Sequence, residues 1–260
     1  MRLTAGILPK FIMSGHNKWH KIKRQKGVAD IKRGQFFTKY ARLITLAVRE
    51  GGGSTDPSNN FKLRLSIEKA REINMPKENI KRAIDRGAGK EVGAADLSQT
   101  IYEGYASFGV ALIIDAVTDN KQRTASILKH LLELAGGHLG SPGSVSYLFE
   151  RRGLITVQKG ENSYDQVFEK MLEIGATDFE ESGDVYEVYT DAGKLHEIKE
   201  KLSQLNFKIN SSELIFFPKT TILISEKEKA EKILKLMGEL EALDDVQKVY
   251  ANFDMPATFV

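Results

Sequence analysis

The side chains best suited to chemistry gather near the N-terminus, in the sequence GHNKWHKIKRQKG at 15–27. This segment, the basic arm, holds five Lys or Arg, two His, the only Trp of the chain and no acidic residue. Cations spaced along a segment neutralise successive phosphates and gain free energy from the release of counterions. We therefore expect the arm to bind nucleic acid through His16, Lys18, Trp19, His20, Lys21, Lys23, Arg24 and Lys26.

Three of these side chains allow other roles. Trp19 can stack on an exposed base or pack beneath the arm as an anchor, and we favour the anchor because a lone aromatic makes a poor stacking platform. His16 and His20 have the i,i+4 spacing of a shared metal site. However, the next carboxylate along the chain is Asp30, and the surrounding cations would repel a metal ion. We expect no metal and no cofactor, and we interpret both histidines as further donors to a polyanion.

The glycine-rich stretch GGHLGSPGS at 136–144 invites comparison with a phosphate-binding loop. It lacks the G-x-x-x-x-G-K-[ST] pattern, and the SVSYLFE that follows is typical of a strand. A helix N-terminus is what would concentrate donors on a phosphate. Turn formation therefore explains these glycines better than phosphate binding does.

An acidic run between Asp178 and Asp191 is typical of a solvated hairpin. The alternative is an acidic patch that docks a basic protein or keeps nucleic acid away from this part of the chain. The residues of this alternative patch are Asp178, Glu180, Glu181, Asp184 and Glu187.

Other function classes find little support in the sequence. The chain has no cysteine, and no nucleophile–base triad or carboxylate pair has convincing spacing, so we expect no enzyme. The longest apolar runs, such as VALII at 110–114, are far shorter than the roughly 20 residues of a membrane span. MRLTAGILPKFI at the start lacks the features of a signal peptide. We expect a cytoplasmic protein in which residues 1–12 are a disordered extension or follow an upstream start before Met13.

Charge is strongly segregated along the chain, although the formal net charge is only +3. Residues 14–90 contain 19 Lys or Arg and 7 Asp or Glu, a formal charge of +12. Residues 1–13 add +2, which leaves −11 for residues 91–260. The basic front attracts polyanions and the acidic remainder repels them.

Helical periodicity dominates the basic part of the chain. From about Ala29 to Glu50, apolar residues recur on one arc, and GGG at 51–53 ends the helix. We expect the opposite, cationic face to extend the nucleic-acid site through Lys32, Arg33, Lys39, Arg42 and Arg49. Asp56-Pro57 is typical of an N-cap before a second helix reaching about Asn74. Pro76 opens a third helix that ends at Gly87.

Strands and helices alternate in the remainder. Residues 153–217 give strand–helix–strand–strand–helix–strand, which is the ferredoxin-like split βαβ order. Strands at 105–118 and 144–150 with a helix between them, joined to strand–helix–strand at 219–253, would make a second such set. Two consecutive domains would instead leave each half-sheet short of strands.

We therefore expect an α+β protein with an N-terminal three-helix domain followed by two ferredoxin-like α+β domains, one inserted in the other. The predicted parts are a disordered extension at 1–13, a basic helical domain at 14–90, a discontinuous α+β domain at 91–150 plus 218–260, and an inserted ferredoxin-like α+β domain at 151–217.

Several long motifs in this order resemble the YebC/PmpR family, whose eukaryotic relatives are mitochondrial translational activators of cytochrome c oxidase. They are GHNKWHKIKRQKG, DIKRGQFFTKYARLITLAVREGG, DPSNNFKLRLSIEKAREINMPKENIKRAIDRG, YEGYASFGVALIIDAVTDNKQRT and GGHLGSPGSVSYLFERRG. The resemblance runs from Met13 to the C-terminus, and Asn17 stands where the family commonly has Ser. It implies a cytoplasmic three-domain protein. Bacterial members are described as DNA-binding transcriptional regulators, and a second view places the family on the ribosome, assisting synthesis of proline-rich stretches.

Three functions remain open from the sequence. A DNA-binding transcriptional regulator would need a recognition helix with base-reading side chains, and on the helix 29–50 only Gln35 is well placed. A ribosome-associated translation factor needs only a cationic surface that fits ribosomal RNA. A protein-interaction scaffold would use the basic face to dock an acidic partner, and its binding to nucleic acid would be absent even at low salt.

Overall fold

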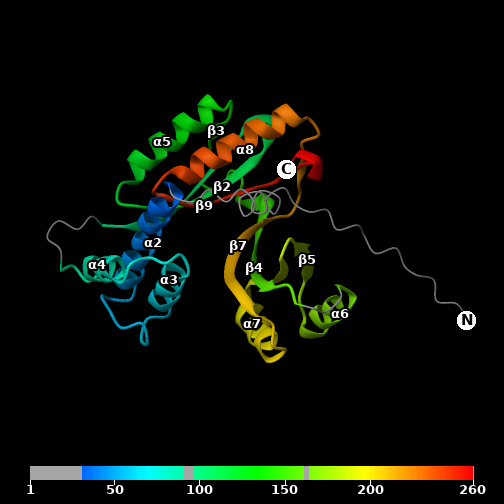
Figure 1. The fold of residues 1–260 in the computed structure, drawn as a ribbon. Helices are drawn as coiled ribbons and strands as arrows, with labels where there is room; N and C mark the ends of the chain where they lie inside the picture. The colour runs from blue at the N-terminus through cyan, green and yellow to red at the C-terminus, as the bar shows by residue number, and fades with distance from the viewer. Residues whose placement is uncertain (1–30, 91–95, 161–163, 260) are drawn as a thin grey trace, which may run out of the picture.

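The computed structural model describes residues 31–90, 96–160 and 164–259, and it confirms the α+β class (Figure 1). The described chain begins with three helices, α2 (Ile31–Glu50), α3 (Phe61–Glu72) and α4 (Lys77–Gly87). The apolar arc predicted for α2 is buried against the other two helices through Ile44, Ala47 and Val48. The predicted extension at 1–13 lies outside the described residues.

The N-cap of the second helix differs from the prediction. Asn60, not Asp56, caps α3, since its Oδ1 accepts a hydrogen bond from the Leu63 N–H at 3.0 Å. Its Nδ2 also donates to the Ala47 carbonyl at 2.7 Å, which ties the start of α3 to α2. Asp56 instead accepts from the Ser58 N–H and closes a local turn. Asn60 serves better because one amide both caps α3 and satisfies a carbonyl near the end of α2.

The first sheet is antiparallel, with strand order β3-β1-β2-β9. Its elements are β1 (Ser98–Tyr105), β2 (Ala111–Thr118), β3 (His138–Leu139) and β9 (Val246–Ala251). Helices α5 (Lys121–Leu134) and α8 (Lys227–Ala242) cover one face of it (Figure 1). β9 joins this sheet from the far end of the chain, where it pairs with β2.

The strands predicted for this sheet were partly wrong. The single strand expected at 105–118 is a hairpin, because a 3-10 turn at Ser107–Gly109 separates β1 from β2, with a φ of 65° at Phe108. In the expected strand at 144–150, Ser146–Leu148 form a second 3-10 turn, and only the last two residues belong to a strand, which starts at Phe149 and continues to Gln158. The expected strand at 220–224 is reduced to β8 (Ile222–Leu223), which pairs with β10 (Phe253–Asp254) outside the main sheet. The sequence reading missed β1, which supplies the missing strand of this sheet.

The second sheet follows the predicted order of elements. Its strands are β4 (Phe149–Gln158), β5 (Asp178–Ser182), β6 (Val185–Asp191) and β7 (Ile209–Pro218), in the order β5-β6-β4-β7. Helices α6 (Tyr164–Ile174) and α7 (Leu195–Gln204) pack on one face. This is the split βαβ arrangement. The domain limits 14–90, 91–150 plus 218–260, and 151–217 stay a proposal, with which the membership of the two sheets is consistent.

The two sheets meet through an apolar cluster. Tyr189 and Ile215 of the second sheet are buried with Ala111, Ile113 and Tyr250 of the first. Phe149 at the start of β4 pairs with Pro218 at the end of β7, so the chain enters and leaves the second sheet at neighbouring positions. The second sheet is therefore held to the first by packing as well as by its two connections.

A charged cluster joins all three parts of the protein. Glu213 of β7 forms an ion pair with Lys248 of β9, and its carboxylate lies 3.6 Å from the Nζ of Lys69 on α3. Burial works to raise the pKa of Glu213, but the charges of Lys248 and Lys69 outweigh it and lower the pKa to about 2. The carboxylate therefore stays ionised between its two lysines.

Replacing Glu213→Gln should reduce the free energy of unfolding by about 3 kcal/mol at pH 7, because the half-buried Lys248 loses its charged partner. The folded pKa of Glu213 lies below its ordinary value of 4.5, so the ion pair stabilises the fold above that pH. This contribution disappears as the pH falls toward 2. The difference between wild type and variant should therefore shrink on acidification, as measured by urea unfolding at several pH values.

The exposed pair of Lys235 and Glu239 on α8 offers a matched control. Glu239→Gln should change the free energy of unfolding by less than about 0.5 kcal/mol at any of these pH values. An equal loss for both variants, or a Glu213→Gln loss that is independent of pH, would contradict the role assigned to Glu213.

Candidate nucleic-acid interface

Most of the predicted nucleic-acid site lies outside the described residues. This holds for the whole basic arm, that is, for His16, Lys18, Trp19, His20, Lys21, Lys23, Arg24 and Lys26. Lys32 and Arg33 lie in the first turn of α2, but their side chains are outside the description as well. The structure therefore places three of the predicted side chains, namely Lys39, Arg42 and Arg49.

Lys39 and Arg42 connect α2 to the first sheet and its helices. Lys39 is 8% exposed, and its Nζ donates to the carbonyl of Glu241 at the end of α8 at 2.6 Å. Arg42 donates to the Val117 carbonyl at 3.1 Å and forms an ion pair with Asp245. The cationic face of α2 is thus packed against another part of the protein at these two positions.

Asp245 is the centre of this connection. Its carboxylate accepts hydrogen bonds from the hydroxyls of Thr124 at 2.5 Å and Thr118 at 3.1 Å, and Arg123 lies 3.3 Å away. Burial works to raise the pKa of Asp245, but the Thr124 hydrogen bond and the Arg42 charge lower it below its ordinary value. Sequence reasoning missed this residue, since Asp245 stands 203 positions from Arg42 and nothing near it in the chain marks it.

Arg49 behaves differently, because its ion pair lies at the surface. Its guanidinium is 2.8 Å from the carboxylate of Asp96, a side chain that is fully exposed. The Arg49 side chain itself is only 21% exposed and has further contacts within the protein, so phosphate binding by Arg49 stays a prediction.

Helices α3 and α4 carry the clearest exposed positive charge of the described residues. Residues 61–90 contain nine Lys or Arg and four Asp or Glu. The side chains of Arg71, Lys77 and Lys81 are exposed. Because α3 and α4 bury only one stripe each against α2, their outer faces remain open to a polyanion. Sequence reasoning assigned the charge of this region to the domain but did not single out these residues.

The end of the glycine-rich loop at 136–144, together with the two residues after it, holds an anion supplied by the chain itself. The carboxylate of Glu103 accepts hydrogen bonds from the N–H groups of Gly143, Val145 and Ser146, at 2.7 to 2.8 Å. Burial works to raise the pKa of Glu103, but these donors lower it below its ordinary value. The loop thus gathers donors as a phosphate loop would, and β1 fills the position with its own side chain.

Only part of the predicted acidic patch lies at the surface. Glu187 is 1% exposed and accepts a hydrogen bond from the Tyr189 hydroxyl at 2.9 Å, and Glu180 is 9% exposed. Asp178 is half-buried, Glu181 pairs with Lys159, and Asp184 is exposed. A docking partner could therefore reach at most three of the five carboxylates in this conformation, and docking stays a prediction.

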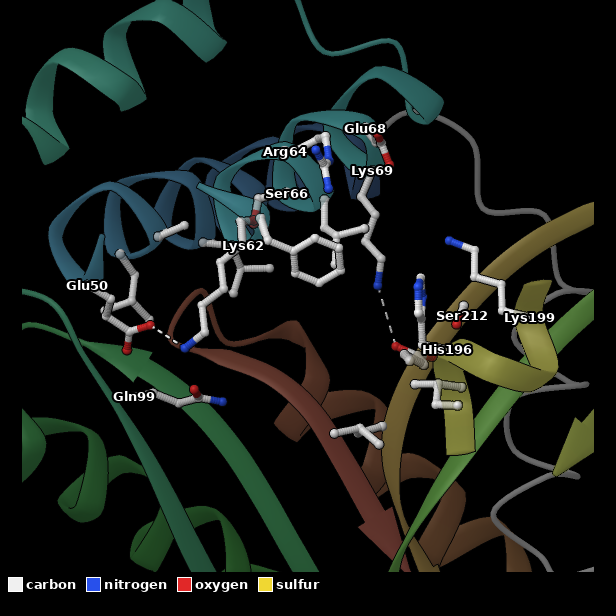
Figure 2. A pocket seen from close by; sticks show the side chains of 18 of the residues that line it. Glu50, Lys62, Arg64, Ser66, Glu68, Lys69, Gln99, His196, Lys199 and Ser212 are labelled. Atoms are coloured by element: carbon white, nitrogen blue, oxygen red, sulfur yellow. Dashed lines mark hydrogen bonds and ion pairs between the residues drawn. The ribbon is translucent and has the colours of Figure 1, made fainter. Parts of the chain in front are cut away.

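A groove of about 860 Å³ lies between the helical part and the inserted part (Figure 2). Lys62, Arg64 and Lys69 of α3 approach it from one side, and His196 and Lys199 of α7 from the other (Figure 2). Apolar side chains make up much of its lining, among them Leu43, Leu46, Leu65, Leu195 and Leu214. The groove thus combines apolar surface with a charged rim, on which Glu50, Glu68 and Glu213 stand beside the cations.

Within 31–90, 96–160 and 164–259, no group of three or more His, Asp or Glu side chains could hold a metal ion. Among the helices in those ranges, none has the length and hydropathy needed to cross a membrane.

Two family models match the chain and together cover most of it. The TACO1/YebC protein N-terminal domain matches residues 17–90, and the TACO1/YebC second and third domain matches residues 97–253. The family resemblance seen in the sequence motifs is therefore confirmed.

Curated relatives and a solved structure agree with this match. A "Probable transcriptional regulatory protein" of Sulfurihydrogenibium sp. is 45% identical over 249 residues, 95% of this chain and 98% of that protein. One of the same name from Persephonella marina is 47% identical over 94% of this chain and 96% of its own length. A crystal structure of a conserved hypothetical protein from Aquifex aeolicus matches with a TM-score of 0.78 and 44% identity, over 87% of this chain and 92% of that one. On these grounds the chain belongs to the TACO1/YebC family.

Proposed function

We propose that the protein is a nucleic-acid-binding regulator of gene expression whose N-terminal part grips phosphates. The observation that carries this proposal is the charge segregation, with +12 on residues 14–90 and −11 on residues 91–260. The exposed cations of α3 and α4 support it, because they provide sites for phosphates close to the basic arm in the chain. The names of the curated relatives support a regulatory role in transcription.

The contacts of α2 narrow the way in which nucleic acid would be recognised. A recognition helix must present its side chains to the edges of bases in the major groove. Lys39 and Arg42 instead contact Glu241, Val117 and Asp245, so this part of α2 is not open to a groove. We therefore infer that the protein reads phosphates and shape rather than base sequence.

This mode of recognition favours a second candidate function, that of a translation factor bound to ribosomal RNA. Folded RNA is recognised largely through its shape and backbone, which a cationic surface without a recognition helix can provide. Duplex DNA bound through phosphates alone would give a regulator with weak sequence preference. The two functions therefore differ in the nucleic acid that the protein binds in the cell, which is ribosomal RNA for a translation factor and duplex DNA for a transcriptional regulator.

Reversing the charge of the arm tests the proposal directly. The variant Lys21→Glu, Lys23→Glu, Arg24→Glu and Lys26→Glu should lose binding to nucleic acid, because four phosphate contacts become repulsive. Fluorescence anisotropy with a labelled DNA duplex and a labelled RNA hairpin measures this loss, and circular dichroism checks the fold. A control variant reverses four exposed lysines of α5 and α8, namely Lys129, Lys227, Lys232 and Lys235. Equal affinities for the arm variant and wild type would refute the arm as the site.

Salt dependence distinguishes the two sets of helical cations. The logarithm of the association constant falls linearly with the logarithm of the salt concentration, and each phosphate contact adds roughly 0.7 to 0.9 to the steepness of this fall. Replacing Arg71, Lys77 and Lys81 with alanine should therefore reduce the steepness by about 2. Alanine at Lys39 and Arg42 should leave the steepness unchanged and lower the melting temperature instead. The opposite pattern would place the phosphates on α2 and overturn our assignment.

Sedimentation of a cell lysate through a sucrose gradient decides between the two functions. If the protein is a translation factor, wild type should travel with ribosomal fractions and the arm variant should stay at the top. Nuclease treatment and high salt control for trapping. Wild type that stays at the top, yet is retained on DNA from the same lysate, would establish the transcriptional role instead.

A further inference from the structure

An aromatic ring stands exposed beside the groove between α3 and α7. Phe61 is the first residue of α3, directly after its N-cap Asn60, and 58% of it is exposed. The guanidinium of Arg64, one helical turn further on, lies over this ring with its Cζ 5.3 Å from the centroid. One exposed apolar side chain is ordinary, but this ring also lines a groove that carries apolar surface and cations.

Two of the four Lys and Arg side chains that line the groove are paired with carboxylates of the protein itself. Lys62 pairs with Glu50 at 2.7 Å, and Lys69 with Glu213 at 3.6 Å. Arg64 and Lys199 are different, since neither forms an ion pair within the part of the chain that the structure describes. They reach the groove from α3 and α7 respectively, so positive charge remains on both sides of its apolar lining (Figure 2).

A ligand that suits this groove must be flat and apolar in one part and anionic in another. An unpaired nucleotide has both properties, because every base offers a π face and carries a phosphate on either side. A base within a duplex does not, since its faces are covered by its neighbours. The volume of about 860 Å³ lies within the range of roughly 300 to 1,000 Å³ typical of small-molecule sites.

We propose that this groove binds an unpaired nucleotide of single-stranded nucleic acid, with the base on Phe61 and the flanking phosphates at Arg64 and Lys199. This inference rests on the proposed nucleic-acid binding and adds a preference for single-stranded segments. The arm and the exposed cations would hold any polyanion, whereas the groove would select the strand whose bases are free. The same chemistry is offered by RNA and by single-stranded DNA.

Phe61→Ala tests the stacking contact in the full-length chain. It should weaken binding of a single-stranded oligonucleotide by about tenfold, as loss of one base–aromatic contact does. The affinity for a fully paired duplex without unpaired bases should change by less than about twofold, since the duplex is bound through phosphate contacts alone. Phe61→Trp keeps a stacking ring and should retain single-strand affinity. Leu172→Ala on α6, which removes another exposed apolar side chain, should leave both affinities unchanged.

Lys199→Ala tests the phosphate contact on the opposite wall. The slope of log K against log salt should fall by about 0.7 for the single strand and stay constant for the duplex. Lys232→Ala removes an exposed lysine of α8 and should change neither slope. Single-stranded RNA and DNA oligonucleotides of the same base sequence show which backbone the groove prefers. Phe61-dependent binding of either one supports the proposal.

The outcomes separate this inference from the proposed function. If the charge-reversed arm variant loses all binding while Phe61→Ala keeps the single-strand affinity of wild type, nucleotide binding in the groove is refuted. The proposed nucleic-acid binding by the protein is then still supported. Equal weakening of single strand and duplex by Phe61→Ala would also refute nucleotide binding in the groove. If an acidic peptide competes for the groove in a Phe61-dependent manner while single strands do not bind there, the occupant is a protein rather than a nucleic acid.

Discussion

Two carboxylates with cations on more than one side hold the parts of this protein in one arrangement. Glu213 stands between Lys69 and Lys248, and Asp245 accepts Arg42 and Arg123. Removing a charge from water costs several kcal/mol unless partners replace the lost solvent. Those partners come from different parts of the chain, so the cost is recovered only when the helical part, the first sheet and the inserted part are assembled together.

This constraint also decides which cations are left for a ligand. Lys39 and Arg42 belong to the connection between α2 and the first sheet, although their place on a cationic helix face suggested phosphate binding. Lys69 likewise lines the groove but already faces Glu213. Among the described residues, cations without such a partner remain on α3, α4 and α7, and the two proposed binding surfaces lie on or beside the N-terminal helices.

Sequence patterns predicted helices and strands well where hydrophobic periodicity and glycine stops alone determine the local structure. The period of α2 and its glycine stop indicated a helix ending at Glu50, and the alternation through 153–217 indicated the split βαβ order. The β1–β2 hairpin was missed because Ser107, Phe108 and Gly109 carry none of the usual hairpin turn pairs, and the apolar run continues across them. The roles of Asn60 and Asp245 depend on partners that only the folded chain brings near, so a sequence pattern cannot indicate them.

Because a sequence pattern does not indicate distant partners, it also cannot show that an anion-binding site is already occupied by a carboxylate of the protein. The glycines at 136–144 suggested either donors for a phosphate or simple turns, and the structure contains both features, since the loop amides converge on Glu103. A run of donors in the sequence reveals the chemistry but not whether the protein supplies the acceptor. At Glu103, Glu213 and Asp245 the chain supplies its own carboxylate, so the donors around each of them are already engaged within the protein. Arg64 and Lys199 lack such a carboxylate within the described residues, and on that physical difference their assignment to a ligand rests.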